Sequence, residues 1–512
     1  MMELSVLSWA LLSLVLLLVV YVFYMSSSLR LFRKLGVPGP APWPIIGNFH
    51  LELKHGISNY HRQAYQKYKS ERVYGLYRGK QPFMVICDLD VIRDICVKNF
   101  DHFVNRTTYE TEEPFSHALT QVKDEHWKNI RTVVSPTFNT VRLKRMFAHI
   151  KTNGQLLVKY LENRQERNEP VELKEVLSRY TMDVIASTGF GVQSNSLEDD
   201  GSPFMTEAKR LMSGPGFLII LAFFLSFLKP ILRLLNISKL PRQSLQFFRR
   251  FVDAAVESRK GEAGTVQSRN DFLQLLMEAM HDKDGEDDNM TPEELAALNS
   301  SGVKRKLNYV EVQAQALLFL LAGYETVSAS LSFTLFLLAL NPECLQKAQE
   351  EVDEVLQGKF PDYESTQSLH YLDMCLNEGM RLYPPTPLLD RVCSDDIEIR
   401  GIRIPKGVNA TFPVCAIHRD PDLWPEPDKF IPERFTAENK ANRHPYAHMP
   451  FGQGPRNCVG MRLALLEMKV ALAAILQKLT PVRCEKTVYP MNFVRFRMLA
   501  KDGLWVRLEA RR

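Results

Sequence analysis

A glycine-rich stretch near the C-terminus, PFGQGPRNCVG at residues 450–460, places one cysteine in a turn directly before a predicted helix. Gly452, Gly454 and Gly460 can adopt positive φ and let backbone N–H groups approach the sulfur of Cys458, because no Cβ stands in the way. The helix that follows would direct its positive end at that sulfur, which favours the thiolate form. The pattern therefore predicts that Cys458 is a metal ligand, and a buried free cysteine in a loop is the alternative.

The pattern F-G-x-G-x-R-x-C-x-G over these residues resembles the haem-binding loop of the cytochromes P450, the haem-thiolate monooxygenases. The resemblance implies haem b as the cofactor, with Cys458 as the thiolate ligand of its iron. It also implies that Arg456 points at a haem propionate and that Phe451 packs against the ring. The implied fold is mainly α with a small β region, the cytochrome P450 fold, whereas helical periodicity alone indicates only a large α-rich protein.

A long apolar run at 314–340 predicts a helix through the core, because its flanking segments are too polar for a second membrane span. Gly323 and Thr326 put a small residue and a hydroxyl on one part of this helix, where the hydroxyl can disturb backbone hydrogen bonding and hold water beside a ligand. In the resembled family this position borders the oxygen pocket, and the resemblance implies that Glu325 and Thr326 relay protons during oxygen activation. An ordinary buried helix that tolerates a glycine and a threonine is the alternative.

Glu378 and Arg381 stand three residues apart on a predicted helix, which puts a carboxylate and a guanidinium on one face. Taken alone, this spacing is typical of a solvated surface pair. By resemblance, Arg434 is the third member of a buried ion network whose role is structural, and removing one partner would leave a buried charge unpaired at about 3 to 5 kcal/mol. Gly379 departs from the family pattern and is expected to weaken the helix by roughly 1 kcal/mol.

Trp127 and Arg131 are four residues apart, so an indole N–H and a guanidinium can reach one anionic target. A helix packing pair is the ordinary alternative. In the resembled family the target is a haem propionate, and Arg106 and Arg391 resemble further propionate partners. His418, in the segment AIHRDPDLWP, is expected to be structural rather than a second ligand.

The chain of 512 residues is long enough for three average domains, yet the segments that resemble the family extend from about Gly36 to the C-terminus. One large domain is therefore expected. The eight cysteines show no C-x-x-C spacing, which argues against a zinc ribbon or a disulfide scaffold and fits a reducing compartment. A formal net charge of +5 gives no indication of nucleic-acid binding.

The N-terminus carries an apolar run of 22 residues from Leu4 to Met25 without a cleavage pattern. About 20 apolar residues span a bilayer, so 1–29 is predicted to be an uncleaved transmembrane signal anchor. Residues 30–47 form a basic and proline-rich linker, expected to be extended and stiff, and 48–512 form the haem-thiolate monooxygenase domain.

Basic residues follow the anchor, whereas only Glu3 precedes it. The positive-inside rule therefore places the catalytic domain in the cytosol behind a single membrane pass. The family resemblance implies the endoplasmic reticulum membrane. A second apolar patch at 217–228 is too short to span, so a buried helix and a membrane-dipping element are the two candidates.

A basic cluster lies beside Trp127 in the sequence and consists of Lys123, Lys128, Arg142, Lys144 and Arg145. Charge runs are usually solvated faces, yet the resembled family docks an acidic flavoprotein on this side. The resemblance therefore implies an NADPH-cytochrome reductase as partner, with cytochrome b5 as a further candidate.

The resemblance implies a membrane-bound monooxygenase that inserts one oxygen atom from O2 into lipophilic substrates, such as steroids, fatty acids or xenobiotics. The main alternative is an endoperoxide isomerase like thromboxane synthase, a relative whose helix lacks the threonine that Thr326 matches. A non-catalytic haem carrier or sensor is a third reading. The residues expected to line the substrate pocket are Leu321, Ala322, Thr386 and Pro387. Substrate identity, regioselectivity, physiological role and oligomeric state do not follow from these patterns.

Overall fold

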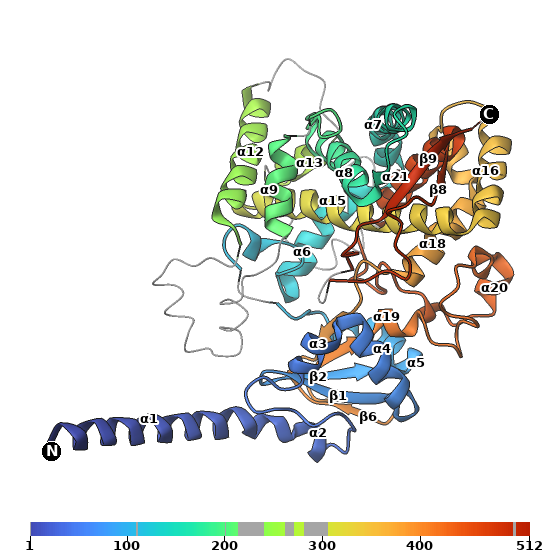
Figure 1. The fold of residues 1–512 in the computed structure, drawn as a ribbon. Helices are drawn as coiled ribbons and strands as arrows, with labels where there is room; N and C mark the ends of the chain where they lie inside the picture. Colours follow the sequence, from blue (N-terminus) through green and yellow to red (C-terminus); the bar gives the residue numbers. More distant parts are fainter. Residues whose placement is uncertain are drawn as a thin grey trace.

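The computed structural model describes residues 2–108, 111–199, 201–212, 240–261, 271–280, 306–494 and 498–511. A large helical region lies above a smaller region built around a sheet, and α1 projects from the latter (Figure 1). This mainly helical architecture with small sheets confirms the predicted fold class. The apolar patch at 217–228 lies outside the described residues.

Helices form most of the body. Their bounds are α1 Met2–Ser27, α2 Leu31–Lys34, α3 Phe49–His55, α4 Ile57–Tyr68, α5 Leu89–Arg93, α6 Asp124–Val134, α7 Thr140–Glu166, α8 Leu173–Phe190, α9 Pro203–Met212, α12 Arg242–Gly261, α13 Phe272–Glu278, α15 Tyr309–Leu340, α16 Pro342–Leu356, α17 Tyr363–Ser368, α18 His370–Leu382, α19 Val414–Ile417, α20 Ala437–Ala441 and α21 Met461–Lys478.

The strands form small sheets, and the larger one joins strands from 73–86 with strands from 389–412. The strands are β1 Val73–Arg78, β2 Gln81–Ile86, β3 Val171–Glu172, β4 Leu389–Val392, β5 Ile397–Ile399, β6 Ile402–Ile404, β7 Asn409–Phe412, β8 Leu479–Val482 and β9 Trp505–Ala510. The larger sheet has the order β1-β2-β7-β4, in which β2 and β7 are parallel and the other neighbours antiparallel. Because this order joins distant segments, the sheet ties the chain into one body.

The helix α15 runs through the centre of the helical region (Figure 1). It begins at a capping box, in which the Asn308 side chain accepts from Glu311 N at 2.9 Å and the Glu311 carboxylate accepts from Asn308 N at 2.8 Å. The helix is long and apolar enough to cross a membrane, but 72% of its most apolar window is buried inside the protein. The prediction of a core helix at 314–340 is therefore confirmed.

Glycines allow two other helices to approach α15 closely. A Cβ on Gly323 would lie 2.6 Å from Ile185 Cδ1 of α8, and a Cβ on Gly379 of α18 would lie 2.3 Å from Thr334 Oγ1 of α15. Both distances are far shorter than a van der Waals contact. Gly379, expected from sequence only to weaken its helix, is thus required by the packing of α18 on α15.

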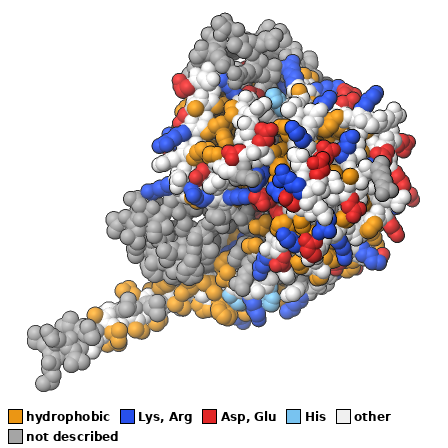
Figure 2. Space-filling view, turned by 45° about the horizontal axis from the view of Figure 1, so that its top comes forward, with side chains coloured by type: hydrophobic (Ala, Val, Ile, Leu, Met, Phe, Trp, Pro, Cys, Tyr) orange, Lys and Arg blue, Asp and Glu red, His pale blue; other side chains and the backbone are white. Residues whose placement is uncertain are grey.

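The N-terminal helix α1 exposes apolar side chains, whereas the surface of the body carries mixed charges. Apolar side chains such as Trp9 and Leu17 are exposed along it, and Figure 2 shows them beside the mixed charges of the body. The linker at 30–47 does not stand apart from the body, because Phe32 is buried and Gly75 N of β1 donates to Pro38 O at 2.8 Å. The linker therefore lies on the sheet.

Candidate active site

The cysteine lies in a tight loop that ends where α21 begins. Gly452 and Gly454 both have φ of +72°, and Cys458 N donates to Phe451 O at 2.8 Å. A Cβ on Gly454 would lie 2.2 Å from Cys96 O, so glycine is required there for space as well as for backbone angle. Gly460 keeps a negative φ and is the N-cap of α21. Two of the three glycines thus adopt the positive φ that was expected, whereas Gly460 does not.

The Cys458 thiol faces competing electrostatic influences. Burial raises its pKa, whereas a hydrogen bond from the backbone of Gly460 and the guanidiniums of Arg131 and Arg106 lower it. The net effect is a raised pKa, and a cation beside the sulfur would lower it. A bound metal ion supplies that charge, because thiolates are deprotonated on coordination.

Arginines from separate segments converge around this loop. Arg106 donates to Arg456 O at 2.7 Å, and Arg131 of α6 donates to Asn457 O at 3.0 Å and to Asn457 Oδ1 at 2.7 Å. Arg391 of β4 donates to Gln453 O at 3.3 Å. The structure therefore brings the predicted propionate partners together at the loop.

The guanidinium of Arg456 spans from this loop to the segment that precedes α6. It donates to the carbonyl oxygens of Val104 at 2.8 Å, Leu119 at 3.2 Å and Val122 at 3.2 Å. The same guanidinium stacks over the Trp127 ring, with 4.1 Å from its central carbon to the ring centroid. Three of its five N–H donors are used in these bonds, so two remain for an anion.

The arginine cluster carries an excess of buried positive charge. Burial, followed by Arg106, lowers the pKa of Arg391 to about 10, and burial with Arg106, Arg391 and Arg131 lowers the pKa of Arg456 to about 9. Asp390 is the carboxylate that counters this charge among the described residues, and the Nε atoms of Arg106 and Arg391 are buried without a hydrogen-bond partner. The cluster therefore fits a ligand with two negative charges, such as the two propionates of haem.

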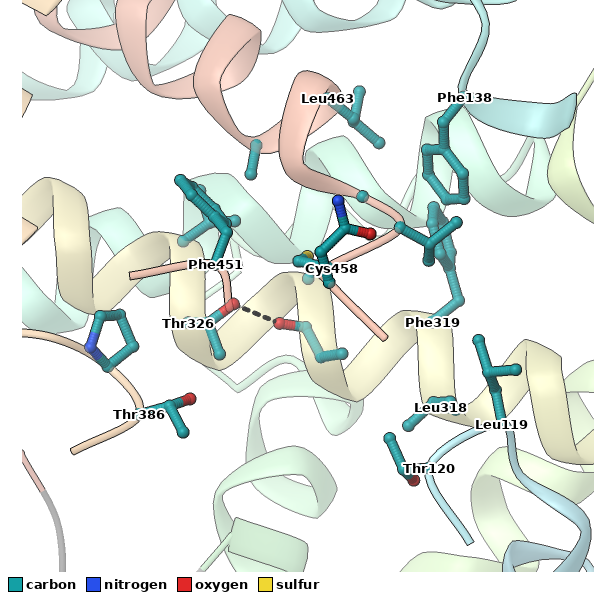
Figure 3. A pocket seen from close by; sticks show the side chains of 18 of the residues that line it. Leu119, Thr120, Phe138, Leu318, Phe319, Thr326, Thr386, Phe451, Cys458 and Leu463 are labelled. Atoms are coloured by element: carbon teal, nitrogen blue, oxygen red, sulfur yellow. Dashed lines mark hydrogen bonds between the residues drawn. The ribbon is translucent and has the colours of Figure 1, made fainter. Parts of the chain in front are cut away.

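A cavity lies between the Cys458 loop and α15 (Figure 3). Its volume is about 330 Å³, which lies within the range of roughly 300 to 1,000 Å³ that is typical of a small-molecule pocket. Apolar side chains dominate its wall, among them Leu119, Phe138, Phe272, Leu318, Phe319, Ala322, Val327 and Leu463.

Most of the predicted site residues line this cavity. They are Arg106, Trp127, Arg131, Ala322, Thr326, Thr386, Phe451, Arg456 and Cys458. Thr326 donates its hydroxyl proton to Ala322 O at 2.7 Å, and α15 stays α-helical through this position. The hydroxyl therefore adds a hydrogen bond to the helix without breaking it.

Four predicted residues lie outside the cavity wall. Leu321 is buried in the core, where the helical rotation of about 100° per residue turns it away from the face of Ala322. Pro387 does not line the cavity, whereas its neighbours Pro385 and Leu389 do. Arg391 does not line it either and donates instead to Gln453 O of the cysteine loop.

Glu325 is the fourth predicted residue outside the cavity wall, and its carboxylate pairs with Lys174 Nζ of α8 at 3.2 Å. The structure therefore does not bring Glu325 and Thr326 to the same surface of α15.

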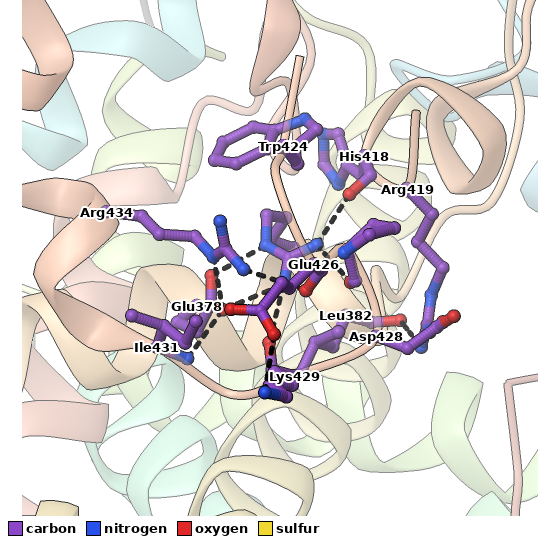
Figure 4. Close-up of polar contacts among 12 residues, drawn as sticks. Glu378, Leu382, His418, Arg419, Trp424, Glu426, Asp428, Lys429, Ile431 and Arg434 are labelled. Atoms are coloured by element: carbon purple, nitrogen blue, oxygen red, sulfur yellow. Dashed lines mark hydrogen bonds and ion pairs between the residues drawn. The ribbon is translucent and has the colours of Figure 1, made fainter. Parts of the chain in front are cut away.

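The predicted ion network of Glu378, Arg381 and Arg434 is present and buried (Figure 4). Arg381 donates to the two Glu378 oxygens at 2.6 and 2.7 Å, and Arg434 Nε lies 3.3 Å from Glu378 Oε1. Arg381 also donates to the carbonyl oxygens of His418 and Pro427, each at 2.8 Å. The network therefore fastens the 418–431 loop to α18, which is a structural role.

His418 supports the cysteine loop from the same region. Its Nε2 accepts from Met449 N at 2.9 Å, and burial, with Arg381, lowers its pKa to about 3. The neutral imidazole is thus a hydrogen-bond acceptor and lies outside the cavity wall. This placement supports the prediction of a structural histidine.

Sequence reasoning missed several residues of the site, among them Phe319, which lines the cavity. Asn457 receives Arg131, Leu119 lines the cavity, and Gln315 of α15 lines it while bonding to the backbone near Leu119. The position of Gln315 inside the apolar run at 314–340 was the one available signal, because a buried amide needs partners.

A cysteine that faces an apolar cavity beside buried arginines, in a mainly helical fold, is the arrangement expected of a haem-thiolate protein. Residues 37–503 match the cytochrome P450 family, so the chain belongs to that family, whose cofactor is a cysteine-ligated haem.

Curated relatives agree over nearly the full length. The chain is 40% identical to cytochrome P450 3A16 of Mus musculus over 486 residues, 94% of this chain and 92% of the relative. It is 41% identical to cytochrome P450 3A31 of Mesocricetus auratus over 478 residues, 92% of this chain and 90% of the relative. It is 40% identical to cytochrome P450 3A2 of Rattus norvegicus over 503 residues, 97% of this chain and 95% of the relative. The chain is accordingly a P450 monooxygenase, which confirms the predicted enzyme class.

Proposed function

We propose that Cys458 binds the iron of haem b and that the surrounding cations hold its propionates. The residues assigned to the haem are Arg106, Trp127, Arg131, Arg391, Phe451 and Arg456. One observation carries this assignment: the buried guanidiniums of Arg391 and Arg456 and the partly buried guanidinium of Arg106 share Asp390 as their nearby carboxylate among the described residues, beside an apolar cavity with a thiol in its wall. Haem bound there supplies one-electron chemistry and the activation of O2.

Thr326 handles protons on the other side of the cavity. Its hydroxyl donates to Ala322 O, which leaves the oxygen lone pairs free to accept from water in the cavity. In this proposal Thr326 Oγ1 accepts a hydrogen bond from a water in the cavity and so holds it, and the second O–H of that water donates a proton into the cavity. Glu325 can contribute only after its pair with Lys174 opens, because that pair holds the carboxylate away from the cavity wall.

The substrate is held mainly by apolar contact. Ala322 leaves space on the α15 side of the cavity, and Thr386 supplies a hydroxyl from the segment after α18. Lipophilic molecules such as steroids fit this lining, because apolar burial provides affinity and a few hydroxyls provide orientation. Insertion of one oxygen atom converts such a molecule into a more polar product.

An acidic flavoprotein reductase docks on the surface beside the cysteine loop, and cytochrome b5 is a second candidate for the same surface. Lys128 of α6 pairs with Glu125 at 2.8 Å, and Lys144 of α7 pairs with Glu364 at 2.8 Å. Exposed pairs of this kind contribute about 0 to 1 kcal/mol, so a partner's carboxylates can replace them. Both helices flank the loop, since Arg131 of α6 reaches Asn457 and α7 packs on α21.

The protein is anchored in the endoplasmic reticulum membrane by α1, with the catalytic domain in the cytosol. The relatives are microsomal enzymes, which supports a membrane location. The exposed apolar side chains of α1 and the basic residues Arg30, Arg33 and Lys34 that follow it support a single pass with this orientation.

The Thr326→Ala variant tests the monooxygenase assignment against the isomerase alternative. With reductase present, we expect NADPH consumption to continue while product formed per NADPH falls about tenfold or more, because proton transfer groups contribute factors of this size. Thr334→Ala is the matched control, since Thr334 makes the same type of bond to Ser330 O at 2.8 Å but packs against α18. Unchanged turnover of an endoperoxide without reductase in both variants would support the isomerase instead.

A further inference from the structure

The first two turns of α15 carry polar side chains that bind different neighbours. Glu311, Gln313 and Gln315 are all buried in a helix that is otherwise largely apolar. The Glu311 carboxylate bonds to His126 of α6 at 2.5 Å, and Gln313 bonds to Asp253 of α12. Gln315 differs from these two because its partners are backbone groups.

The Gln315 amide forms a two-point clamp on one loop. Its Oε1 accepts from Leu119 N at 2.8 Å, and its Nε2 donates to His117 O at 2.8 Å. The second Nε2 proton goes to Glu311 O at 3.2 Å, so both amide donors are used. Gln315 is 2% exposed; its bond from Leu119 N is buried and its bond to His117 O is partly buried.

The clamped loop forms part of the cavity wall. Leu119 and Thr120 line the cavity next to Leu318 of α15 (Figure 3). From the opposite side, Arg456 of the cysteine loop binds the carbonyl oxygens of Leu119 and Val122. The 117–122 loop is therefore bound to α15 through His117 and Leu119 and to the cysteine loop through Leu119 and Val122. Thr120 directly follows Leu119, the residue that takes part in both attachments.

We propose that Gln315 is a positioning residue that determines substrate specificity by fixing Leu119 and Thr120 against the cavity. Without the amide, the buried Leu119 N is left unpaired and the partly buried His117 O loses its donor. A protein relieves a buried unpaired group by letting the segment open to water. An open segment widens the cavity and lets a substrate bind in several orientations. The inference rests on the assignment of this cavity as the substrate pocket.

The test compares Gln315→Met with Gln349→Met in the full-length, haem-loaded protein. Methionine keeps the length of the side chain but makes neither bond. Gln349 is the matched control, because it donates to Leu479 O at 3.3 Å and Thr480 Oγ1 at 3.0 Å in a region away from the cavity wall. Amide hydrogen exchange of 115–122 is measured in the wild type and in both variants. Testosterone serves as a rigid probe: its binding is followed by optical titration, and the ratio of its oxidation products is compared.

We expect Gln315→Met to keep its haem, to exchange 115–122 about tenfold faster or more, and to yield a broader product ratio with weaker testosterone binding. Gln315→Glu, which keeps the acceptor for Leu119 N but not the donor for His117 O, should lie between. Exchange and product ratio equal to those of the wild type, or equal effects from Gln349→Met, would overturn the proposal. Fast exchange of the Leu119 amide in the unmutated protein would also overturn it, whatever the variants do. The exchange measurement does not depend on turnover. If the wild type shows slow exchange at Leu119 but does not oxidise testosterone, the proposed function fails while the clamp itself stands.

Discussion

Single residues set how this protein responds to pH, and His418 is the clearest case. Its neutral imidazole accepts from Met449 N, two residues before Phe451, and burial lowers its pKa to about 3. In the unfolded chain the pKa of histidine is about 6.5. The unfolded state therefore binds an extra proton below that pH, so stability is full above pH ~6.5 and declines as the pH falls toward ~3.

The His418→Gln variant tests this account, because glutamine keeps an acceptor for Met449 N–H and does not titrate. Between pH 7 and pH 5 we expect the free energy of unfolding of the wild type to fall by about 2 kcal/mol more than that of the variant, at ~1.4 kcal/mol per pKa unit. Urea titrations at the two pH values measure the difference. The same pH dependence in both proteins would show that His418 is not the group responsible.

At the scale of helices, the contact of α18 with α15 explains the glycine inside a buried E-x-x-R helix. Alanine at Gly379 would gain about 1 kcal/mol of helix propensity but would force a Cβ into Thr334, and overpacking costs about 1 to 3 kcal/mol. We expect Gly379→Ala to destabilise the protein, and we expect Thr334→Ala to relieve part of the loss. A double-mutant cycle from denaturation curves should give a favourable coupling of about 1 kcal/mol. Additive effects would mean that the two residues do not clash.

Local spacing predicted much of the site, and helix phase limited the rest. The Glu378 and Arg381 pair depends on a three-residue spacing and the cysteine loop on one continuous stretch, 450–460, which sequence shows directly, whereas Arg131 contacts Asn457 from a distant part of the chain. The sequence did not predict which face of α15 lines the cavity, because this helix is buried on nearly every side and no polar stripe marks its orientation. Leu321 was expected in the pocket from its place in this helix and Glu325 from the family resemblance, and both lie outside the cavity wall, while Phe319 and Gln315 were missed.

At the scale of the whole molecule, the sheet that joins β2 to β7 could not be predicted from sequence. Phe83 pairs with Asn409 across more than half of the chain, and nothing in either strand specifies its partner. The one-domain organisation was nevertheless expected, because motifs of one family occur along almost the whole length. The packed linker at 30–47 was not expected, since its contact with β1 depends on the small size of Gly75 beside Phe32.

The proposed docking surface for the reductase also depends on the whole molecule. We expect the Lys128→Glu and Lys144→Glu double variant to slow reduction of the haem severalfold at low salt, with haem content unchanged, because charge complementarity accelerates encounter. Lys159→Glu on the same helix, about 22 Å from Lys144 at 1.5 Å per residue, is the control. Stopped-flow reduction at low and high ionic strength measures the effect. Equal rates in all three proteins at low salt would exclude this surface.

The central claim is that Cys458 is the thiolate ligand of a haem. The most direct test is the reduced carbon monoxide difference spectrum of the full-length protein and of Cys458→Ala. We predict a Soret band shifted far to the red in the wild type, as thiolate ligation produces, and no such band in a folded, haem-loaded Cys458→Ala variant. A red-shifted band that persists in the variant, or its absence from folded, haem-loaded wild type, would contradict the account.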